Sequence, residues 1–569
     1  MPGMIGGLEA RMGKGTRRGR RRDRRERIRA LNGRSLPDIL LHPQGTDAPV
    51  WKYFIPVLVL AFAARAGIAL YSDFFLHADE LYQVLEQGHR LAFGNGLVPW
   101  EYFYGVRPLL LPVVVAGMLM VFDVFGLGQP VWYVDGVKLL FCAISLLIPA
   151  GMYFFARQHF GETSGRVALL AGAFWYELVG FAHKPLAEFV ATGLLLVALA
   201  VCMRPSSDKI RTKIWLLAFL PVMLAALRIQ YAPIAFMLLG LFFLRTEKKM
   251  AFGVVVVTSV IAVGVFDALT WGGGLFHSYI SYFRYHNAYQ TLVVSHIAKH
   301  PGYQYLIWLA IASVGLGLLC VVLALRDVRR YGFLLVLLIA LVVLHSVPGH
   351  KEYRYIFLAI PLFLMIGADI VAQFAMNRKY LCAAVVFVVV SVGGILERLP
   401  YQDRMYLAFF GQEPHKIGII DKQNLFLDVS PDLFDAYRYL AQAPDVVGVW
   451  QLGLSYPSTP GYYYLHHKIP FYDRKTGMAH IGANLNKILT SVSHIVSLRD
   501  ISIPAYMLEK KFGSVRIYCR EQKDLAVRQW EHHTPVFGEA FAEGMLRTSS
   551  DARPFPPNAG IRFLDEDRR

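Results

Sequence analysis

The chain alternates long apolar runs with short polar interruptions, a pattern that predicts an α-helical membrane protein with many crossings. About twenty apolar residues are needed to cross a hydrocarbon core of roughly 30 Å. The apolar runs that could do so are 51–70, 108–126, 137–155, 167–181, 186–203, 214–244, 250–270, 304–325, 331–348, 355–375 and 379–396. Because 214–244 has room for two short spans or a broken pair, we expect about ten to twelve crossings.

Hydropathy falls for good after residue 396, so residues 397–569 are predicted to form a separate domain outside the membrane. Alternating segments at 491–500 and 514–519 predict strands, whereas 431–443 has helical spacing and an acidic first turn. We therefore expect a small α/β domain that ends in an irregular, proline-rich tail.

Composition agrees with a membrane protein, since 55% of the 569 residues are hydrophobic and only 17% are charged. The net charge of +17 does not indicate nucleic-acid binding, because residues 1–34 alone hold twelve Arg or Lys against three acids. A basic segment ahead of a first span stays in the cytoplasm, which predicts a largely disordered cytoplasmic tail at 1–50, a transmembrane domain at 51–396 and an outward loop at 71–107.

The sequence context of the asparagines gives an indication of the membrane in which the protein lies. All eight lack a Ser or Thr two residues on, so the chain carries no glycosylation acceptor of the Asn-x-Ser/Thr type. This favours a multi-pass protein of a bacterial inner membrane, with the endoplasmic reticulum membrane as the alternative.

The polar interruptions are where chemistry is expected, and the first contains "HADELYQVLEQGHR", which starts at His77. On a helix, Asp79, Gln83 and Glu86 share one stripe, and Asp79 and Glu80 lie in the first turn, where the helix dipole favours ionised carboxylates. The two acids are either ordinary first-turn residues or a general base held at the membrane surface.

The same loop continues with "PWEYFYGVRP", which adds Trp100, Glu101 and Arg107. Interfacial aromatic residues often form belts, and an arginine at the foot of a span can snorkel to the interface. Aromatic faces, a carboxylate and an arginine are also what a sugar and a phosphate require, so both interpretations stay open.

Two later interruptions add further candidates. Residues 271–290 are rich in Tyr, His and Phe and include His277 and Asn287, but no spacing there matches a metal site. The second, "PGHKEYR", gathers cations that could stabilise a departing phosphate or serve only for snorkelling and orientation. Arg228 lies well inside an apolar run, where a charge needs a partner or a cavity.

Taken in order, these segments resemble glycosyltransferase family 22, the lipid-linked-sugar-dependent mannosyltransferases of N-glycan and glycosylphosphatidylinositol assembly. The resemblance is carried by "HADELYQVLEQGHRLAFGNGLVPWEYFYGVRP", "FDALTWGGGLFHSYISYFRYHN", "GHKEYRYIFLAIP" and "YPSTPGYYYLHHKIPFY", four collinear matches between residues 77 and 472. It departs at "YPSTPGYY" and at "HKPLAE" (183–188), which leaves acceptor recognition open. With the missing acceptors for glycosylation, a bacterial member is expected.

The resemblance implies a GT-C fold, a polyprenyl-phosphate sugar donor, a glycan or glycolipid acceptor and inversion at the anomeric carbon. Asp79, or else Glu80, would act as the base. The donor phosphate would be bound by Arg107, His350, Lys351 and Arg354. The sugar and acceptor would be bound by His77, Gln83, Trp100, Glu101, Arg228, Asp267, His277, Asn287 and Glu352.

Two other classes of protein remain as alternatives, and no cofactor is expected with certainty. Intramembrane Arg228 and Asp267 would also suit a transporter or flippase of lipid-linked sugars. A non-catalytic subunit that binds a lipid-linked sugar is the third possibility. A divalent cation has no ligand motif to support it. Membrane lipids are expected partners, and nucleic acid is not.

Overall fold

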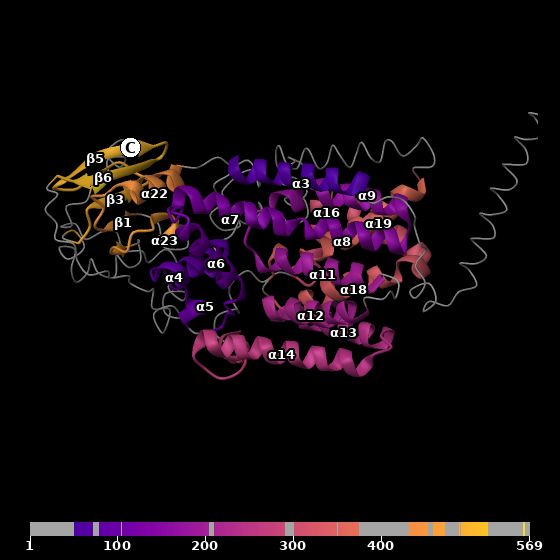
Figure 1. The fold of residues 1–569 in the computed structure, drawn as a ribbon. Coiled ribbons are helices and arrows are strands. Elements are labelled where there is room, and N and C mark those ends of the chain that lie inside the picture. The colour runs from indigo at the N-terminus through magenta and orange to yellow at the C-terminus, as the bar shows by residue number, and fades with distance from the viewer. Residues whose placement is uncertain are drawn as a thin grey trace, which may run out of the picture.

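The chain folds, in a computed structural model, into a bundle of apolar helices with a small α/β unit at one end (Figure 1). The structure describes residues 51–71, 79–103, 105–203, 210–290, 301–313, 315–349, 351–374, 432–452, 459–472, 489, 491–521 and 562–563. Several predictions fall outside the described backbone or side chains, namely those for residues 1–50 and 379–396, for nearly all of the irregular C-terminal tail, and for His77, Trp100, Asn287 and His350.

Four helical stretches of the described residues are long and apolar enough to cross a membrane. They are α3 (Trp51–Tyr71), α7 (Pro130–Ser145) with α8 (Leu147–His159), α14 (Lys249–Trp271), and α17 (Leu316–Ala324) with η3 (Leu325–Asp327) and α18 (Val328–Ser346). Shorter helices complete the bundle: α9 (Glu162–Phe174), α10 (Tyr176–Gly180), α11 (Ala187–Met203), α12 (Ile210–Leu227), α13 (Ala232–Arg245), α15 (His277–Gln290), α16 (Gln304–Ala312) and α19 (Ala359–Phe374).

The run 214–244 forms the broken pair that the sequence allows. Helix α12 ends at Leu227, and α13 begins after the short turn η2 (Ile229–Tyr231). The break is at Arg228, whose extended backbone (φ −147°, ψ 110°) cannot continue a helix. The guanidinium is thereby placed at the ends of two apolar helices rather than along the side of one.

Two other apolar runs differ from the expectation. Residues 304–325 are divided between α16 and α17, because Gly315 has a positive φ of 77°. The run 108–126 forms α6 (Leu110–Val124), which packs along α4 (Glu86–Phe93) of the first loop, near the α/β unit in Figure 1. Its apolar face therefore meets a loop helix, and α6 is not a regular member of the long bundle.

Glycines permit the closest helix contacts. A Cβ on Gly151 of α8 would lie 2.6 Å from the Leu196 Cβ of α11, and one on Gly172 of α9 would lie 2.9 Å from the Pro149 Cα of α8. Small residues let helix backbones approach in membranes, where packing and not water exclusion holds helices together. These three helices form the centre of the bundle.

A buried arginine satisfies the end of α9. Arg65 of α3 is 0% exposed, and its guanidinium donates to the carbonyls of Gly172 (2.9 Å) and Ala173 (2.6 Å). The last carbonyls of a helix have no intrahelical donor, so a neighbouring side chain can supply one. Arg65 thus joins α3 to the core of the bundle.

The substitution Arg65→Met should destabilise the protein without touching the candidate site. It leaves two buried carbonyls without donors, at a cost of about 1–3 kcal/mol each. We expect a clear fall in the thermal unfolding midpoint of the detergent-solubilised protein, with an intermediate fall for Arg65→Lys, which retains a donor. Equal midpoints for the three proteins would contradict this role.

The C-terminal unit has the α/β character predicted from its sequence. Its sheet has the order β2 (Phe471–Tyr472), β1 (Val449–Leu452), β3 (His494–Ser497), β6 (Val515–Arg520) and β5 (Tyr506–Phe512). β1 is parallel to β2 and β3, whereas β3, β6 and β5 are antiparallel. Helix α22 (Asp432–Gln442) packs on β5 and β6. β4 (Ile501–Ser502) and β7 (Arg562–Phe563) pair separately.

The predicted strands correspond to β3 and β6, and the predicted helix 431–443 corresponds to α22, so these local expectations are confirmed. The unit is nevertheless continuous with the bundle. One apolar core includes residues of α6, α7 and α11 together with Tyr462, Tyr463 and Leu465 of helix α23 (Gly461–Leu465). This contact brings the late segment of the chain to the first loop.

Candidate active site

The first loop presents Asp79 at the start of two short helices. The helix on which the sequence places Asp79, Gln83 and Glu86 is divided into η1 (Glu80–Leu85), which has π-helical hydrogen bonding, and α4, which ends at Gly94 with a φ of 81°. Short π-helical segments are rare and occur often at functional sites. The irregular turn begins directly after Asp79.

Asp79 and Glu80 face different surroundings. Glu80 is 1% exposed, and its carboxylate lies 3.5 Å from the Lys184 ammonium in the loop between α10 and α11. The Asp79 carboxylate instead faces the cations of the later motif. Of the two acids that the sequence offered as a base, the geometry favours Asp79.

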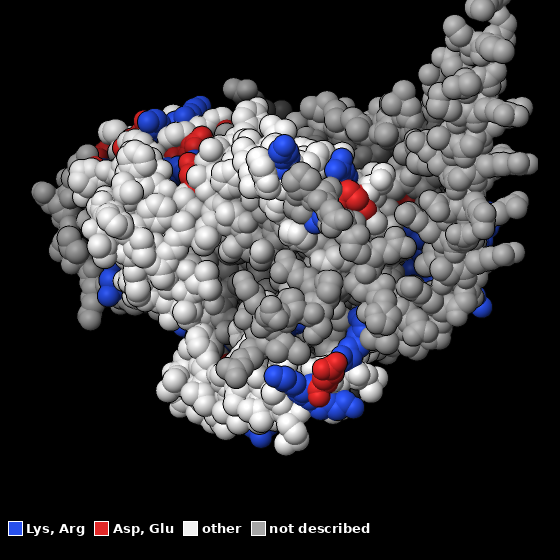
Figure 2. Space-filling model, turned by 45° about the vertical axis from the view of Figure 1, so that its right-hand side comes forward, with Lys and Arg blue, Asp and Glu red and all other residues white. Residues whose placement is uncertain are grey.

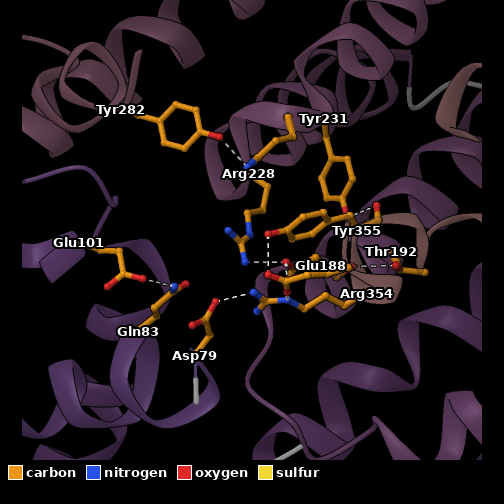
Figure 3. A network of polar contacts seen from close by, with 12 residues as sticks. Asp79, Gln83, Glu101, Glu188, Thr192, Arg228, Tyr231, Tyr282, Arg354 and Tyr355 are labelled. Carbon is orange, nitrogen blue, oxygen red and sulfur yellow. Dashed lines mark hydrogen bonds and ion pairs between the residues drawn. The ribbon is translucent and has the colours of Figure 1, made fainter. Parts of the chain in front are cut away.

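Asp79 forms a direct ion pair with Arg354, although 275 residues separate them in the chain (Figure 3). The distance from Asp79 Oδ2 to Arg354 Nη2 is 2.5 Å, and Arg354 Nε lies 2.5 Å from Glu352. Arg354 belongs to the short helix η4 (Tyr353–Ile356), just before α19. The structure therefore brings the candidate base and a candidate phosphate ligand to one place.

Glu188, at the start of α11, links a second arginine to this pair. Its carboxylate lies 2.5 Å from Arg228 Nη2 and 3.8 Å from Arg354 Nε. The Tyr355 hydroxyl donates to Glu352 at 3.0 Å, and the Tyr231 hydroxyl donates to the Tyr355 carbonyl at 3.0 Å. Figure 3 shows the resulting chain of alternating charges, in which Arg228, Glu188, Arg354 and Asp79 follow one another.

Three donor groups of the two arginines stay without a hydrogen-bond partner within the described residues. They are Nε and Nη1 of Arg228 and Nη1 of Arg354, all buried. The side chains are only 5% and 8% exposed. A buried donor without an acceptor is costly, so these groups suit a ligand with several acceptor oxygens, and their charge favours an anion.

Gln83 and Glu101 form a second polar pair beside Asp79 (Figure 3). Gln83 Nε2 donates to Glu101 Oε1 at 2.8 Å, and the Tyr102 hydroxyl donates to the Gln83 carbonyl at 2.7 Å. Burial, followed by the nearby Asp79 carboxylate, raises the pKa of Glu101 to about 7, against an opposing effect of Arg107. The pair therefore belongs to the same electrostatic environment as Asp79.

Arg107 and His277 lie in an aromatic region next to this pair. The Tyr102 and Trp271 rings stack with centroids 6.0 Å apart, and Trp271 stacks on His277 at 5.8 Å. Trp271 Nε1 donates to the Arg107 carbonyl at 3.2 Å, and the Arg107 guanidinium lies 5.9 Å from the Tyr282 ring centroid. The loops 71–107 and 271–290 thus meet, as the predicted shared site requires.

Two predicted residues make local contacts instead. Both carboxylate oxygens of Asp267 accept from Ser278, at 2.7 Å from its N–H and 2.6 Å from its hydroxyl, near the start of α15. Lys351 Nζ donates to the Pro348 carbonyl. The structure does not bring these groups into the Asp79–Arg354 chain, and their roles in binding stay predictions.

Sequence reasoning missed Glu188 and Tyr355. "HKPLAE" registered only as a departure from a family pattern, yet a carboxylate at the start of an apolar run needs a buried partner as much as Arg228 does. Two charges of opposite sign within apolar runs, Arg228 and Glu188, could therefore have been predicted to pair with each other. For metals, no group of three His, Cys, Asp or Glu side chains among the described residues is placed to hold an ion.

Comparison with known proteins places the chain in a family. Residues 56–400, more than half of the chain, match the model of the Alg9-like mannosyltransferase family. The chain belongs to this family. This Alg9-like protein is thus an enzyme, a mannosyltransferase, as the resemblance in its motifs implied.

Curated relatives of this Alg9-like mannosyltransferase are eukaryotic. GPI mannosyltransferase 3 of Yarrowia lipolytica is 26% identical over 430 residues, which are 74% of this chain and 76% of the relative. GPI mannosyltransferase 3 of Drosophila melanogaster is 21% identical over 60% of this chain and 61% of its own. The bacterial origin and the inner membrane expected from the sequence therefore stay predictions.

A solved structure shows the fold of this Alg9-like enzyme. The crystal structure of ArnT from Cupriavidus metallidurans bound to undecaprenyl phosphate superposes with a TM-score of 0.53 at 14% identity. The match covers 84% of this chain and 100% of that chain. The predicted GT-C fold of a multi-pass membrane protein is confirmed.

Proposed function

We propose that this mannosyltransferase transfers mannose from a polyprenyl-phosphate mannose to a membrane glycolipid, with inversion, on the non-cytoplasmic face of its membrane. The observation that carries the proposal is the ion pair of Asp79 with Arg354, beside buried guanidinium donors that have no hydrogen-bond partner among the described residues. A single displacement at the anomeric carbon requires a base for the acceptor hydroxyl and cations for the leaving phosphate in one site, and both are present here.

In the proposed step, the acceptor hydroxyl attacks the anomeric carbon while a carboxylate oxygen of Asp79 takes the hydroxyl proton. The bond from the anomeric carbon to the phosphate oxygen breaks, and the electron pair stays on the phosphate. Arg354 and Arg228 then hold that phosphate through donors that have no partner within the described residues. Their fixed positive charges stabilise the leaving phosphate, which gains a second negative charge, more than the singly charged phosphodiester of the donor.

The sugar is proposed to lie between this chain of charges and the first loop. Glu101 and Gln83 offer acceptors and donors for its hydroxyl groups, and the stacked Tyr102 and Trp271 rings offer an apolar face. Sugars are commonly bound by such a combination of polar groups and aromatic rings. His277 follows in the same stack, toward the proposed acceptor or lipid groove.

The distribution of basic residues supports the proposed membrane face. The end of the bundle away from Asp79 carries Arg157, Arg166, Arg245, Lys248, Lys249, Arg326, Arg329 and Arg330 at or beside its helix turns. The His159 ring contacts the Arg330 carbonyl at 3.1 Å, and Arg245 contacts Cys202 at 3.0 Å, so the turns of several helices meet there. Figure 2 shows several Lys and Arg at this end of the described surface.

Cytoplasmic loops of membrane proteins carry an excess of Lys and Arg. The basic end is therefore assigned to the cytoplasm and the Asp79 site to the opposite side. The names of the relatives, GPI mannosyltransferases, support a glycolipid as the class of acceptor. The compartment proposed from the sequence is the cell membrane, with the endoplasmic reticulum membrane as the alternative.

Purified enzyme in lipid nanodiscs tests the function. It is given dolichyl-phosphate or undecaprenyl-phosphate [³H]mannose together with lipids extracted from the membranes of its own organism. We expect the label to appear in a glycolipid whose new linkage has the anomeric configuration opposite to that of the donor. Movement of labelled donor across a vesicle bilayer without any product would instead indicate a flippase, and binding without either result a non-catalytic subunit.

A further inference from the structure

The C-terminal unit contacts the loop that carries Asp79 through a densely bonded joint. One side of this joint is Thr459–His467, which includes α23, and the other is η1 and α4 with the residues that follow. The two sides are about 377 residues apart in sequence. They are also two of the four segments whose patterns were noted in the sequence, and no role in the reaction has been assigned to their contact.

A buried carboxylate lies at the centre of the joint. Glu86, the first residue of α4, is 0% exposed. Its Oε1 accepts from the backbone N–H of Leu97 at 2.6 Å and of Tyr462 at 3.0 Å, and its Oε2 accepts from the N–H of Tyr463 at 2.8 Å. One side chain therefore ties the loop to itself and to the first turn of α23.

The backbone around Glu86 is shaped for this contact. Gly461 has a positive φ of 63°, and a Cβ there would lie 2.6 Å from Glu86 Oε2. Burial raises the pKa of Glu86 to about 7, while the three backbone N–H groups act in the opposite direction. Because three donors converge on two oxygens, the ionised carboxylate is the form that satisfies all of them.

Further bonds surround the carboxylate. The Tyr82 hydroxyl, in η1, donates to the Thr459 carbonyl at 2.7 Å, and His89 Nε2 lies 3.1 Å from His466 Nδ1. Asn95 Nδ2 donates to the His466 carbonyl at 3.2 Å. The joint thus runs along both helices of the loop and is not a single point of contact.

The position of η1 gives this joint a consequence for the reaction. η1 spans the six residues between Asp79 and Glu86. One end is held by the contact of Glu80 with Lys184, and the other by Glu86 on α23. A π-helical turn is less favourable than an α-helical one, so its shape depends on what holds its ends.

We propose that Glu86 is a positioning residue, which acts through η1 to hold Asp79 at the reacting hydroxyl, and that the C-terminal unit is a required part of the catalytic site. The proposal rests on the proposed role of Asp79 as the base. The phosphate ligands Arg228 and Arg354 lie on other elements, at the end of α12 and on η4. Disturbing the joint should therefore move the base relative to a donor that stays bound.

The test compares Glu86→Gln with the wild-type enzyme in nanodiscs, with polyprenyl-phosphate [³H]mannose as donor. The amide keeps the shape of Glu86 but places an NH₂ group against a backbone N–H. We expect kcat to fall about 10- to 100-fold, the effect of a displacement of about 1 Å in a reacting group, while the donor KM stays within about threefold.

Asp432→Asn is the matched control. Asp432 Oδ2 accepts from the Ser514 N–H at 2.9 Å on an exposed side of the same unit. This variant removes a comparable carboxylate contact at a place that does not touch the loop. Its kcat and donor KM should stay within about twofold of the wild type. A merely stabilising role of Glu86 would lower the thermal midpoint and leave kcat per folded molecule unchanged, which would overturn the proposal.

Tyr82→Phe decides the matter if Glu86→Gln does not fold. Tyr82→Phe removes one hydroxyl from the joint. A severalfold fall in kcat at constant donor KM supports the positioning role, whereas an unchanged kcat overturns the proposal.

Asp79→Asn separates this proposal from the proposed function. If that variant is inactive while the joint variants keep full kcat, only the positioning role is wrong; if it stays active, the assignment of the base is wrong.

Discussion

Asp79→Asn is expected to reduce turnover by about 10²- to 10⁴-fold, the usual contribution of a positioned general base. Asparagine has nearly the same shape, but it cannot take the proton of the acceptor hydroxyl. Donor affinity should be maintained or rise, because Arg354 Nη2, which lies 2.5 Å from Asp79, becomes available to the donor phosphate. Steady-state transfer and equilibrium binding of polyprenyl-phosphate mannose measure the two quantities separately.

Asp327→Asn is a suitable control for this experiment. The Asp327 carboxylate accepts from the Arg330 N–H at 3.2 Å and caps α18 at the basic end of the bundle. Asparagine is an equally good capping residue, so turnover should remain at the wild-type level. Near-normal turnover in Asp79→Asn would contradict the assignment of Asp79 as the base. The alternative acid, Glu80, would then be tested as Glu80→Gln.

Arg354→Lys should lower kcat/KM for the donor by about 10²- to 10³-fold, equivalent to about 3–4 kcal/mol of transition-state stabilisation. Lysine retains the charge, but it cannot reach Asp79, Glu352 and a phosphate at once as the planar guanidinium does. Because the donor ester and the leaving phosphate both use this group, donor KM should rise as kcat falls. Initial rates over a range of donor concentrations give both values.

Arg330→Lys provides the contrast. Arg330 lies at the basic end, where Nε and Nη2 contact the buried Asp369 carboxylate at 2.5 and 2.7 Å. The same chemical change there weakens a buried ion pair and should lower the thermal midpoint while the donor KM stays constant. A donor KM that is unchanged in Arg354→Lys would contradict the proposed phosphate site.

Local pattern was enough to predict several parts of the fold. The length of 214–244 left room for two short spans or a broken pair, and the structure has the broken pair, with the interruption at Arg228. Alternation predicted β3 and β6. It could not predict that β1 runs parallel to β2 and β3, since parallel pairing joins segments distant in sequence and leaves no local signal.

The site was predictable where chemistry restricts the residue type. An acid in the first loop and an arginine before α19 were expected to meet, and the structure places them in contact. Glu188 was not expected, because a glutamate at the start of a helix is common in any protein. Its role depends on Arg228 and Arg354, which reach it from two other segments of the chain.

The carboxylate of Glu86 and the turn at Gly461 also limit how this enzyme can be recombined with its relatives. A chimera could take its membrane part from one parent and its extramembrane part from another. Its two contact surfaces would then not be complementary, and the Glu86 carboxylate would be buried between them without its backbone donors. Exchange of residues 79–97 together with 459–467 keeps the carboxylate at position 86 of either parent with the backbone N–H donors of the same parent. Studies of acceptor preference by segment swapping should therefore move these two stretches as one module.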